Sequence, residues 1–256
     1  MKVLVIGDVI IDKYIYGTSE RLSPEAPVPV VKHLHEVETL GGAGLVYENL
    51  KSLGVDVTLM ESDHGYRSVK TRVICDGHYV TRIDDDKRAS GNAVLADVLS
   101  NDFSQYEYVI LSDYDKGVLD NAKEIIAHIN TFGCKVLVDP KRPASYYEGA
   151  WLIKPNMLEE SQYGFGQHHW NWIVTDAKGP VRARINKVMY TVEPEQVEVS
   201  DVTGAGDCFL AAFVYGLTKG YEHKRCLELA VKGATEAVKH VGTHTLTVSD
   251  LEEHIV

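Results

Sequence analysis

The sequence predicts an α/β protein with a mostly parallel central sheet, and three observations support this. First, short and almost wholly apolar runs at 2–6, 106–111, 135–138 and 151–153 are typical of buried parallel strands. Second, helical spacing of apolar residues separates several of these runs, as crossover helices require. Third, the 256-residue chain is 45% hydrophobic, enough for one sizeable core, so residues 1–256 are expected to form a single domain.

A turn and a proline-containing segment follow the first strand. Because ligands collect beyond the carboxyl ends of strands in open α/β sheets, Asp8 and Asp12 are expected near a substrate, although Asp12 could also be an ordinary turn aspartate. Residues 14–40 hold β-rich pieces at 14–16 and 28–33 together with three prolines. Proline cannot donate to a sheet ladder, so an edge strand or a separate small sheet is predicted here.

A glycine-opened helix and a hairpin are predicted next. Gly41-Gly42-Ala43-Gly44 precedes an apolar pattern that predicts a helix ending at Gly54, before a strand at 55–60. Runs at 69–75 and 78–83 predict a β-hairpin around Asp76-Gly77. Cationic residues on one face of this hairpin would suit either a substrate phosphate or a solvated surface: Lys70, Arg72 and Arg82.

A βαβ unit is predicted in the middle of the chain, after a modest helix at 91–101. A helix at 120–132 joins the strand at 106–111 to the strand at 135–138, which implies parallel strands and a right-handed crossover. The polar turns after both strands then lie on the same sheet edge as Asp8. The turn residues that this makes candidates for binding phosphate or sugar are Asp113, Lys116 and Lys141.

The strand at 151–153 leads into a predicted helix start at 154–159. Lys154 would meet a phosphate as a point charge, and Asn156 and Glu159 share one face of the first helical turn. Asparagine and glutamate at this spacing also form an ordinary capping pair. Beyond it, the adjacent His168 and His169 point to different faces, so no metal site is predicted there.

Four elements are predicted in the last third of the chain. They are a strand at 172–175, a sheet-edge hairpin at 181–185 and 188–193, a long amphipathic helix at 227–241 that Gly242-Thr243 ends, and a short helix at 250–254.

The stretch Asp201-Val202-Thr203-Gly204-Ala205-Gly206-Asp207 lies directly before an apolar run with helical spacing at 208–217. Its glycines therefore lie at a helix N-terminus, where free N–H groups bind anions and no Cβ keeps a phosphate away. The pattern fits phosphoryl transfer, with backbone amides holding the transferred group and Asp207 taking a proton from a hydroxyl. It also fits an ordinary helix whose first turn carries a stabilising aspartate.

The position of Asp207 also predicts its basicity. A helix N-terminus is expected to lower the pKa of the Asp207 carboxyl and make it a weak base. Weak basicity suffices if the attacking hydroxyl loses its proton late in a loose transition state.

Composition narrows the function classes. The net charge of −11 argues against a nucleic-acid or anionic-membrane partner. The four cysteines lack paired ligand spacing, which indicates free thiols in a reducing compartment. Residues 1–8 read as a strand rather than a signal peptide, and no apolar run approaches the length of a membrane span. A cytoplasmic protein is expected.

Several segments together resemble one known family, the ribokinase-like or PfkB carbohydrate kinases. The similar segments, in the family's order, are GDVIIDKYIYG at 7–17, SPEAPVPVV at 23–31, GGAG at 41–44, LSDYDKG at 111–117, VDPK at 138–141, KPNMLE at 154–159, DVTGAGD at 201–207 and GTHT at 242–245. The wording of SPEAPVPVV and SDYDKG is most similar to the kinase domain of the heptose-phosphate kinase/adenylyltransferases.

This resemblance implies a ribokinase-like three-layer sandwich with a small β lid, near 13–40 and 67–85, over the sugar. In the family such lids often pair between two subunits, and exposed strand edges need covering, so we expect a homodimer through the lid. The resemblance also implies ATP and Mg²⁺ as cofactors. The acceptor would be a small sugar or sugar phosphate, most similar to a heptose 7-phosphate.

Site residues are implied by matching the family's motifs position by position. Asp207 would be the catalytic base, and Asp12 and the pair Gly41-Gly42 would contact the sugar. Asn156 and Glu159 match an NxxE motif that implies magnesium held through water near the nucleotide phosphates. The remaining matches imply nucleotide contacts, with Thr175 and Gly179 near the phosphates and ribose and Gly242 and Thr243 lining the adenine pocket.

Two departures from the family's pattern leave the acceptor open. Leu45 and Tyr47 stand where an asparagine and a small residue are usual, and a helix–strand unit is nearly absent after Asp63-His64-Gly65. Both changes are expected to reshape the sugar site. The acceptor could therefore be ribose, fructose or a nucleoside instead of a heptose phosphate, or the chain could be a catalytically silent nucleotide- or sugar-binding protein.

Overall fold

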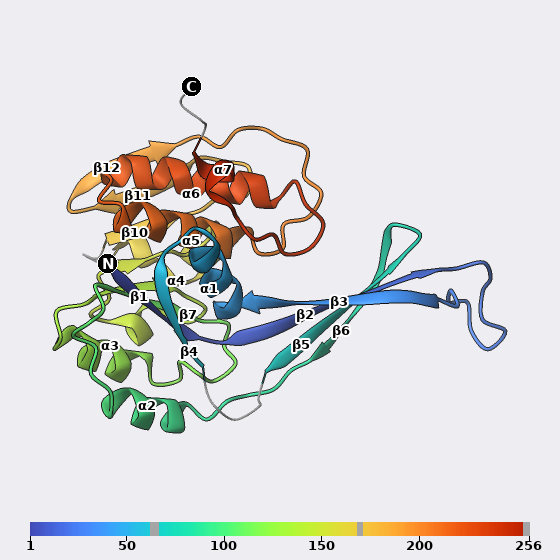
Figure 1. Ribbon diagram of the computed structural model, residues 1–256, viewed down its shortest axis with the longest axis horizontal. Helices are drawn as coiled ribbons and strands as arrows, with labels where there is room; N and C mark the ends of the chain where they lie inside the picture. The colour runs from blue at the N-terminus through green and yellow to red at the C-terminus, as the bar shows by residue number, and fades with distance from the viewer. Residues whose placement is uncertain (62–66, 168–170, 253–256) are drawn as a thin grey trace.

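The computed structural model describes residues 1–61, 67–167 and 171–252, and within them the chain forms two sheets (Figure 1). The central sheet has the strand order β12-β11-β10-β9-β8-β7-β1-β4. Its strands are β1 (Lys2–Gly7), β4 (Asp56–Met60), β7 (Tyr108–Ser112), β8 (Lys135–Asp139), β9 (Leu152–Ile153), β10 (Asn171–Val174), β11 (Val181–Ile185) and β12 (Val188–Val192). All neighbouring pairs from β4 to β10 are parallel, which confirms the predicted α/β class.

Helices cover both faces of the central sheet (Figure 1). They are α1 (Ala43–Ser52), α2 (Gly91–Leu99), α3 (Ala122–Asn130), α4 (Met157–Tyr163), α5 (Ala205–Thr218), α6 (His223–Ala237) and α7 (Val248–Leu251), with 3₁₀ turns at Ala144–Tyr147 and Phe165–Gln167. Alternate residues of β1 supply two cores, because side chains of a strand point alternately to opposite faces. Val3 and Val5 join the cluster with α1, α5 and α6, whereas Leu4 and Ile6 join the cluster with α2 and α3.

A second, four-stranded sheet projects from this body as a long arm (Figure 1). Its strands are β2 (Val9–Thr18), β3 (Lys32–Gly42), β5 (Ser68–Cys75) and β6 (His78–Asp85), in the order β3-β2-β5-β6. The prediction of a separate small sheet is confirmed, and its first two strands are longer than the β-rich pieces at 14–16 and 28–33. The arm's flank is open, because residues 32–38 and all of β6 are exposed.

The edge hairpin forms as predicted, whereas the long helix after it ends earlier than predicted. The hairpin at the sheet edge is confirmed, with Asn186 and Lys187 both at positive φ (50° and 68°), as a tight turn with this twist requires. The long helix ends at Ala237 and not near residue 241, because the Val238 carbonyl accepts the N–H of Ser200 at 2.8 Å and so holds the chain segment that leads into residues 201–207.

The last predicted helix begins at Val248 and ends at Leu251. Residues after 252 lie outside the described part of the chain. The predictions for His168 and His169, and for most of the shortened segment after residue 61, also fall outside it. No helix in the described ranges combines the length and the apolar character needed to cross a membrane.

Candidate functional site

A cavity of about 600 Å³ opens at the carboxyl ends of β7, β8 and β9, beside the start of α5. Its polar wall includes Asp113, Tyr114, Asp139, Lys141, Lys154, Asn156, Glu159, Thr175, Ala205 and Gly206. Its apolar wall includes Val197, Val199, Val231, Ala234 and Val238. One cavity therefore offers an apolar slot for a flat ring system at one end and charged and amide groups at the other.

The turn at 204–207 has the geometry of an anion site. Gly204 adopts a left-handed conformation (φ 78°) that starts α5. Ala205 donates to the Val202 carbonyl and Cys208 to the Gly204 carbonyl, but the N–H groups of Gly206 and Asp207 have no acceptor among the described residues. Gly206 also leaves space, because a Cβ there would lie 3.6 Å from Nζ of Lys154. An anion in the cavity therefore finds free amides and a cation together.

Asp207 lies in the first turn of α5, beside this anion site, and it is only 3% exposed and is not among the residues that line the cavity. Its Oδ1 accepts a hydrogen bond of 2.7 Å from the hydroxyl of Tyr114, which lines the cavity. Burial, and next the charge of Asp139, raise the pKa of the Asp207 carboxyl to about 7. The prediction that the helix N-terminus lowers this pKa is wrong, because loss of solvation outweighs the helix dipole at a buried position. A carboxylate with this pKa is a better base than the one predicted.

Two lysines of the cavity are paired with acids. Nζ of the buried Lys154 lies 2.9 Å from Oδ2 of Asp139, and Nζ of the half-exposed Lys141 lies 3.2 Å from Oε1 of Glu159. Burial raises the pKa of Asp139. Both lysines line the cavity as predicted from the strand ends, whereas Asp139, which faces Lys154, was missed.

Asn156 and Glu159 form a reciprocal capping box at the start of α4. Oδ1 of Asn156 accepts the N–H of Glu159 at 2.9 Å, and Oε2 of Glu159 accepts the N–H of Asn156 at 3.0 Å. The capping alternative is therefore present, and both residues also line the cavity. No group of three or more metal-ligating side chains exists in the described ranges. Because the capping box and Lys141 engage the oxygens of Asn156 and Glu159, these residues would hold a magnesium ion only through its waters.

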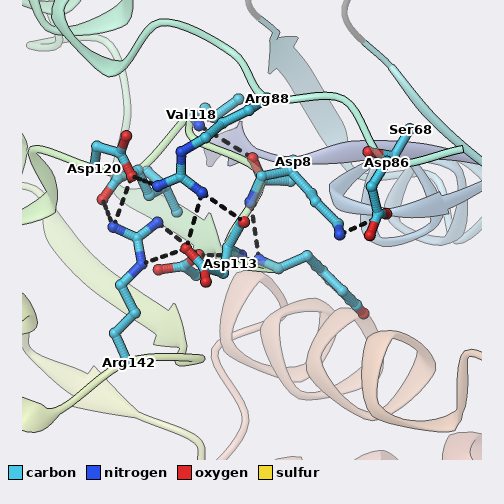
Figure 2. Close-up of polar contacts among 12 residues, drawn as sticks. Asp8, Ser68, Asp86, Arg88, Asp113, Val118, Asp120 and Arg142 are labelled. Carbon is cyan, nitrogen blue, oxygen red and sulfur yellow. Dashed lines mark hydrogen bonds and ion pairs between the residues drawn. The ribbon is translucent and has the colours of Figure 1, made fainter.

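The carboxylates of Asp8 and Asp113 are both bound by neighbouring groups at the loop 113–118 (Figure 2), and of the two only Asp113 lines the cavity. The carboxylate of Asp8 accepts the N–H groups of residues 114, 116 and 118 at 2.9, 3.0 and 3.1 Å. Oδ2 of Asp113 accepts the Tyr147 hydroxyl at 2.6 Å, and Oδ1 lies 3.3 Å from Nη2 of Arg142. Burial raises the pKa of Asp113 to about 6.

Lys116 does not join the other predicted lysines. Its Nζ lies 2.6 Å from Oδ1 of Asp86, and the residue is not among those that line the cavity. Its side chain belongs to the same loop structure as Asp8, so position at a strand end did not place it at the cavity.

The glycine pair makes room for neighbouring side chains. A Cβ on Gly41 would clash with Oδ2 of Asp12. Gly42 has a positive φ of 58°, and a Cβ added to it would lie 2.5 Å from the Asp8 carbonyl oxygen and 3.3 Å from the Tyr114 ring. The carboxylate of Asp12, 4% exposed, pairs with the buried Arg72 of the arm. Both residues belong to arm strands, β2 and β5, so this buried ion pair lies within the arm.

Leu45 and Tyr47, the two residues that depart from the family's pattern, lie in different surroundings. Leu45 is buried beneath the anion site, since a Cβ on Gly204 would come within 2.5 Å of its Cδ2. Tyr47 packs against the core cluster and lies under Nζ of Lys51, 5.5 Å from its ring centre, and it is not among the cavity residues. The Tyr47 ring therefore does not enter this cavity, and its effect on the sugar site stays a prediction.

Asp201 joins two of the predicted site segments and was not itself predicted as a site residue. Oδ1 accepts both the N–H and the hydroxyl of Thr203, at 3.0 and 2.8 Å, and Oδ2 accepts the N–H of Gly242 at 3.0 Å. Burial opposes ionisation of Asp201, but these hydrogen bonds outweigh it and lower the pKa. An aspartate two residues before a threonine is a common turn signal that could have found it.

The nucleotide contacts expected at 242–243 and at 179 lie elsewhere. Gly242 (φ 82°) lies against the Tyr14 ring, and the hydroxyl of Thr243 is 2.8 Å from that of Thr39 on the arm. Neither residue lines the cavity, because its apolar wall comes from α6 and residues 197–199. Of the other two predicted contacts, Thr175 lines the cavity and Gly179 does not. The expectation that Gly242 and Thr243 line an adenine pocket is not met, because their turn faces the arm.

Comparisons with known proteins agree with this architecture. A model of the pfkB family of carbohydrate kinases matches residues 44–250. The chain is 33% identical over 301 aligned residues to the bifunctional protein HldE of Nitratiruptor sp., covering 99% of this chain and 64% of that protein. It is 33% identical over 311 residues to HldE of Syntrophotalea carbinolica, covering 99% and 62%. The chain thus spans less than two thirds of the length of these relatives.

Solved structures show the same fold. Phosphofructokinase-2 from Escherichia coli has a TM-score of 0.75 at 15% identity, with 97% of this chain and 96% of that chain covered. Ribokinase from Thermotoga maritima has a TM-score of 0.73 at 14% identity, with 98% and 97% covered. Together with the family match over most of the sequence, the three-layer sandwich and the glycine turn at α5 lead to one conclusion: the chain belongs to the PfkB family of carbohydrate kinases.

Proposed function

We propose that the protein transfers the γ-phosphoryl group of ATP to a hydroxyl of a sugar or sugar phosphate, with a heptose 7-phosphate-like sugar as the acceptor. The observation that carries the proposal is Asp207, which is hydrogen-bonded to the cavity-lining Tyr114 and follows the free N–H groups that start α5. In-line phosphoryl transfer needs this combination of an anion hole and a base.

Each part of the cavity then has a role. The apolar wall near Val199, Val231 and Val238 takes the adenine ring, and the amides of 204–207 hold the γ-phosphoryl group. Lys154 offsets phosphate charge. Asn156 and Glu159 hold Mg²⁺ through water, and this ion supplies neutralising charge to the phosphates. Ribokinase from Arabidopsis thaliana, a structural neighbour at TM-score 0.68 and 15% identity, was solved with ribose and ATP, which supports a cavity of this kind for ATP.

The acceptor binds on the other side of Asp207, toward the arm. Asp207 interacts electrostatically with Asp139 on the cavity side and with Asp12 of β2 on the arm side. Lys70 and Arg72 of β5 add positive charge there, and burial lowers the pKa of Lys70. A phosphorylated acceptor suits these cations. The similarity to HldE proteins and to heptose-phosphate kinases favours the heptose phosphate over ribose, fructose or a nucleoside.

An acceptor screen tests the proposal. Release of ADP is measured with ATP, Mg²⁺ and a set of sugars, sugar phosphates and nucleosides, and we expect the highest kcat/KM with heptose 7-phosphate. A higher kcat/KM with ribose, fructose or a nucleoside would change the acceptor but keep the kinase. Thermal stabilisation by ATP with Mg²⁺, but no ADP from any acceptor, would instead identify a silent binding protein.

We further propose that the protein forms a homodimer through the arm. Large apolar side chains are exposed on its two outer strands: Leu34 at 58%, Val37 at 43%, Tyr79 at 57%, Val80 at 39% and Ile83 at 59%. Covering such a surface with a second copy is the usual remedy for open strand edges. Ile83→Asp is therefore expected to shift the molecular mass measured by light scattering from dimer to monomer. Leu99→Asp, on α2 away from the arm, is the matched control, and a monomeric wild type would contradict the proposal.

A further inference from the structure

Tyr114 lies between the anion site and the loop that follows β7, and the proposed function gives it no role. Its hydroxyl donates to Oδ1 of Asp207 at 2.7 Å, and its N–H donates to Oδ2 of Asp8 at 2.9 Å. Its ring lies beside Gly42, where a Cβ would be 3.3 Å from two ring carbons. The backbone of Tyr114 is thus held by Asp8, its ring packs beside Gly42, and its one side-chain polar atom is hydrogen-bonded to Asp207.

We propose that Tyr114 is a positioning residue for phosphoryl transfer, whose hydroxyl fixes Oδ1 of Asp207 and turns Oδ2 toward the acceptor hydroxyl. Oδ2 has no hydrogen-bond donor among the described residues, so it is the oxygen left to take a proton. The inference rests on the proposed function, because it needs Asp207 as the base.

The loop that carries Tyr114 is built to hold a fixed position. The carboxylate of Asp8 binds three of its N–H groups. Arg142 and Arg88 both reach Asp120 at its far end, at 3.0 and 2.7 Å (Figure 2). A side chain that orients a base needs such support, since small displacements of reacting groups lower rates strongly.

The hydroxyl of Tyr114 opposes neighbouring negative charges that disfavour the ionised form of Asp207. Asp139 at the end of β8 and Asp12 on β2 oppose ionisation of Asp207, while Lys154 after β9 and the Tyr114 hydroxyl favour it. Burial, and then the charge of Asp207, raise the pKa of Tyr114 well above its ordinary value. The phenol therefore stays protonated and remains a donor at every pH at which the enzyme would be assayed.

Tyr114→Phe removes only the hydroxyl, and its steady-state kinetics test the inference. We expect kcat to fall roughly 10- to 100-fold, as for one hydrogen bond to a charged group, with the KM for ATP little changed. The acid limb of the pH–rate profile should move to higher pH, because a group that favours the ionised carboxylate is lost. Tyr215→Phe is the matched control, since its hydroxyl donates to Glu252 at 2.9 Å from the distal half of the same helix α5, and it should leave both quantities unchanged.

A Tyr114→Phe enzyme with wild-type kcat and pH profile overturns the inference and leaves the kinase intact, whereas wild-type turnover in Asp207→Asn overturns the proposed function itself. In the double variant, Tyr114→Phe should lower kcat no further than Asp207→Asn alone does. A full additional loss of kcat would also overturn the inference about Tyr114. If Tyr114→Phe does not fold, a fluorinated tyrosine at 114, a stronger donor, should move the acid limb to lower pH, and an unmoved limb counts against the inference.

Discussion

Asp207→Asn is expected to lower kcat by at least about 10²-fold with the acceptor that the screen selects, the usual effect of losing a general base. Asparagine has nearly the same shape and still accepts the Tyr114 hydroxyl, but it cannot take a proton. In the wild type, kcat/KM should fall as the pH drops below about 7, because the Asp207 carboxyl is then protonated. Initial rates of ADP release from pH 5 to 9 measure both effects.

The stability of the same variant separates chemistry from folding. Asp207 holds its proton in the folded state up to about pH 7, whereas its ordinary pKa is 3.8. The folded state therefore binds more protons between these values, and the free energy of unfolding falls as the pH rises through this range. Asp207→Asn removes that loss, so its melting temperature at pH 8 should equal or exceed that of the wild type. Near-wild-type turnover would remove Asp207 as the base.

Asp8→Ala is expected to have the largest effect on stability. The Asp8 carboxylate is 2% exposed and is the acceptor for three loop N–H groups, which alanine would leave without a partner. Allowing for some relaxation of the loop, the free energy of unfolding should fall by about 3 kcal/mol and the melting temperature by roughly 6–12 °C. Turnover should fall as well, because this loop carries Tyr114.

Asp102→Ala is the matched control for this loss. The Asp102 carboxylate caps one N–H, that of Ser104 at 2.8 Å, in an exposed turn. Its removal should change the melting temperature little. If Asp8→Ala is no less stable than Asp102→Ala, the loop at 113–118 does not depend on Asp8.

The sequence predicted the layers well because their causes are local. Apolar runs such as Tyr108–Ser112 are strands by composition, and the glycine turn at 204–206 starts a helix where the pattern placed it. The edge hairpin followed from turn chemistry, and the separate arm followed from its prolines. These features depend on neighbours along the chain, which the sequence displays directly.

Side-chain partners were harder to predict, because they depend on contacts between distant segments. Asp8 was expected at the substrate, yet its carboxylate oxygens accept hydrogen bonds from backbone N–H groups more than a hundred residues away. The raised pKa of Asp207 depends on burial and on Asp139, neither of which the spacing of DVTGAGD reveals. Tyr114 carries a signal in the sequence, an aromatic residue between two acids in a polar turn, but only the structure shows the carboxylate that it reaches.

The junction between the arm and the body has a mechanical consequence. Strand β3 ends at Gly42 and helix α1 begins at Ala43, so no linker separates them. Leu45, in the first turn of that helix, supports Gly204 from below. Because β3 and α1 are continuous, we expect a displacement of the arm to move Leu45 and, through its contact with Gly204, the turn that we propose holds phosphate.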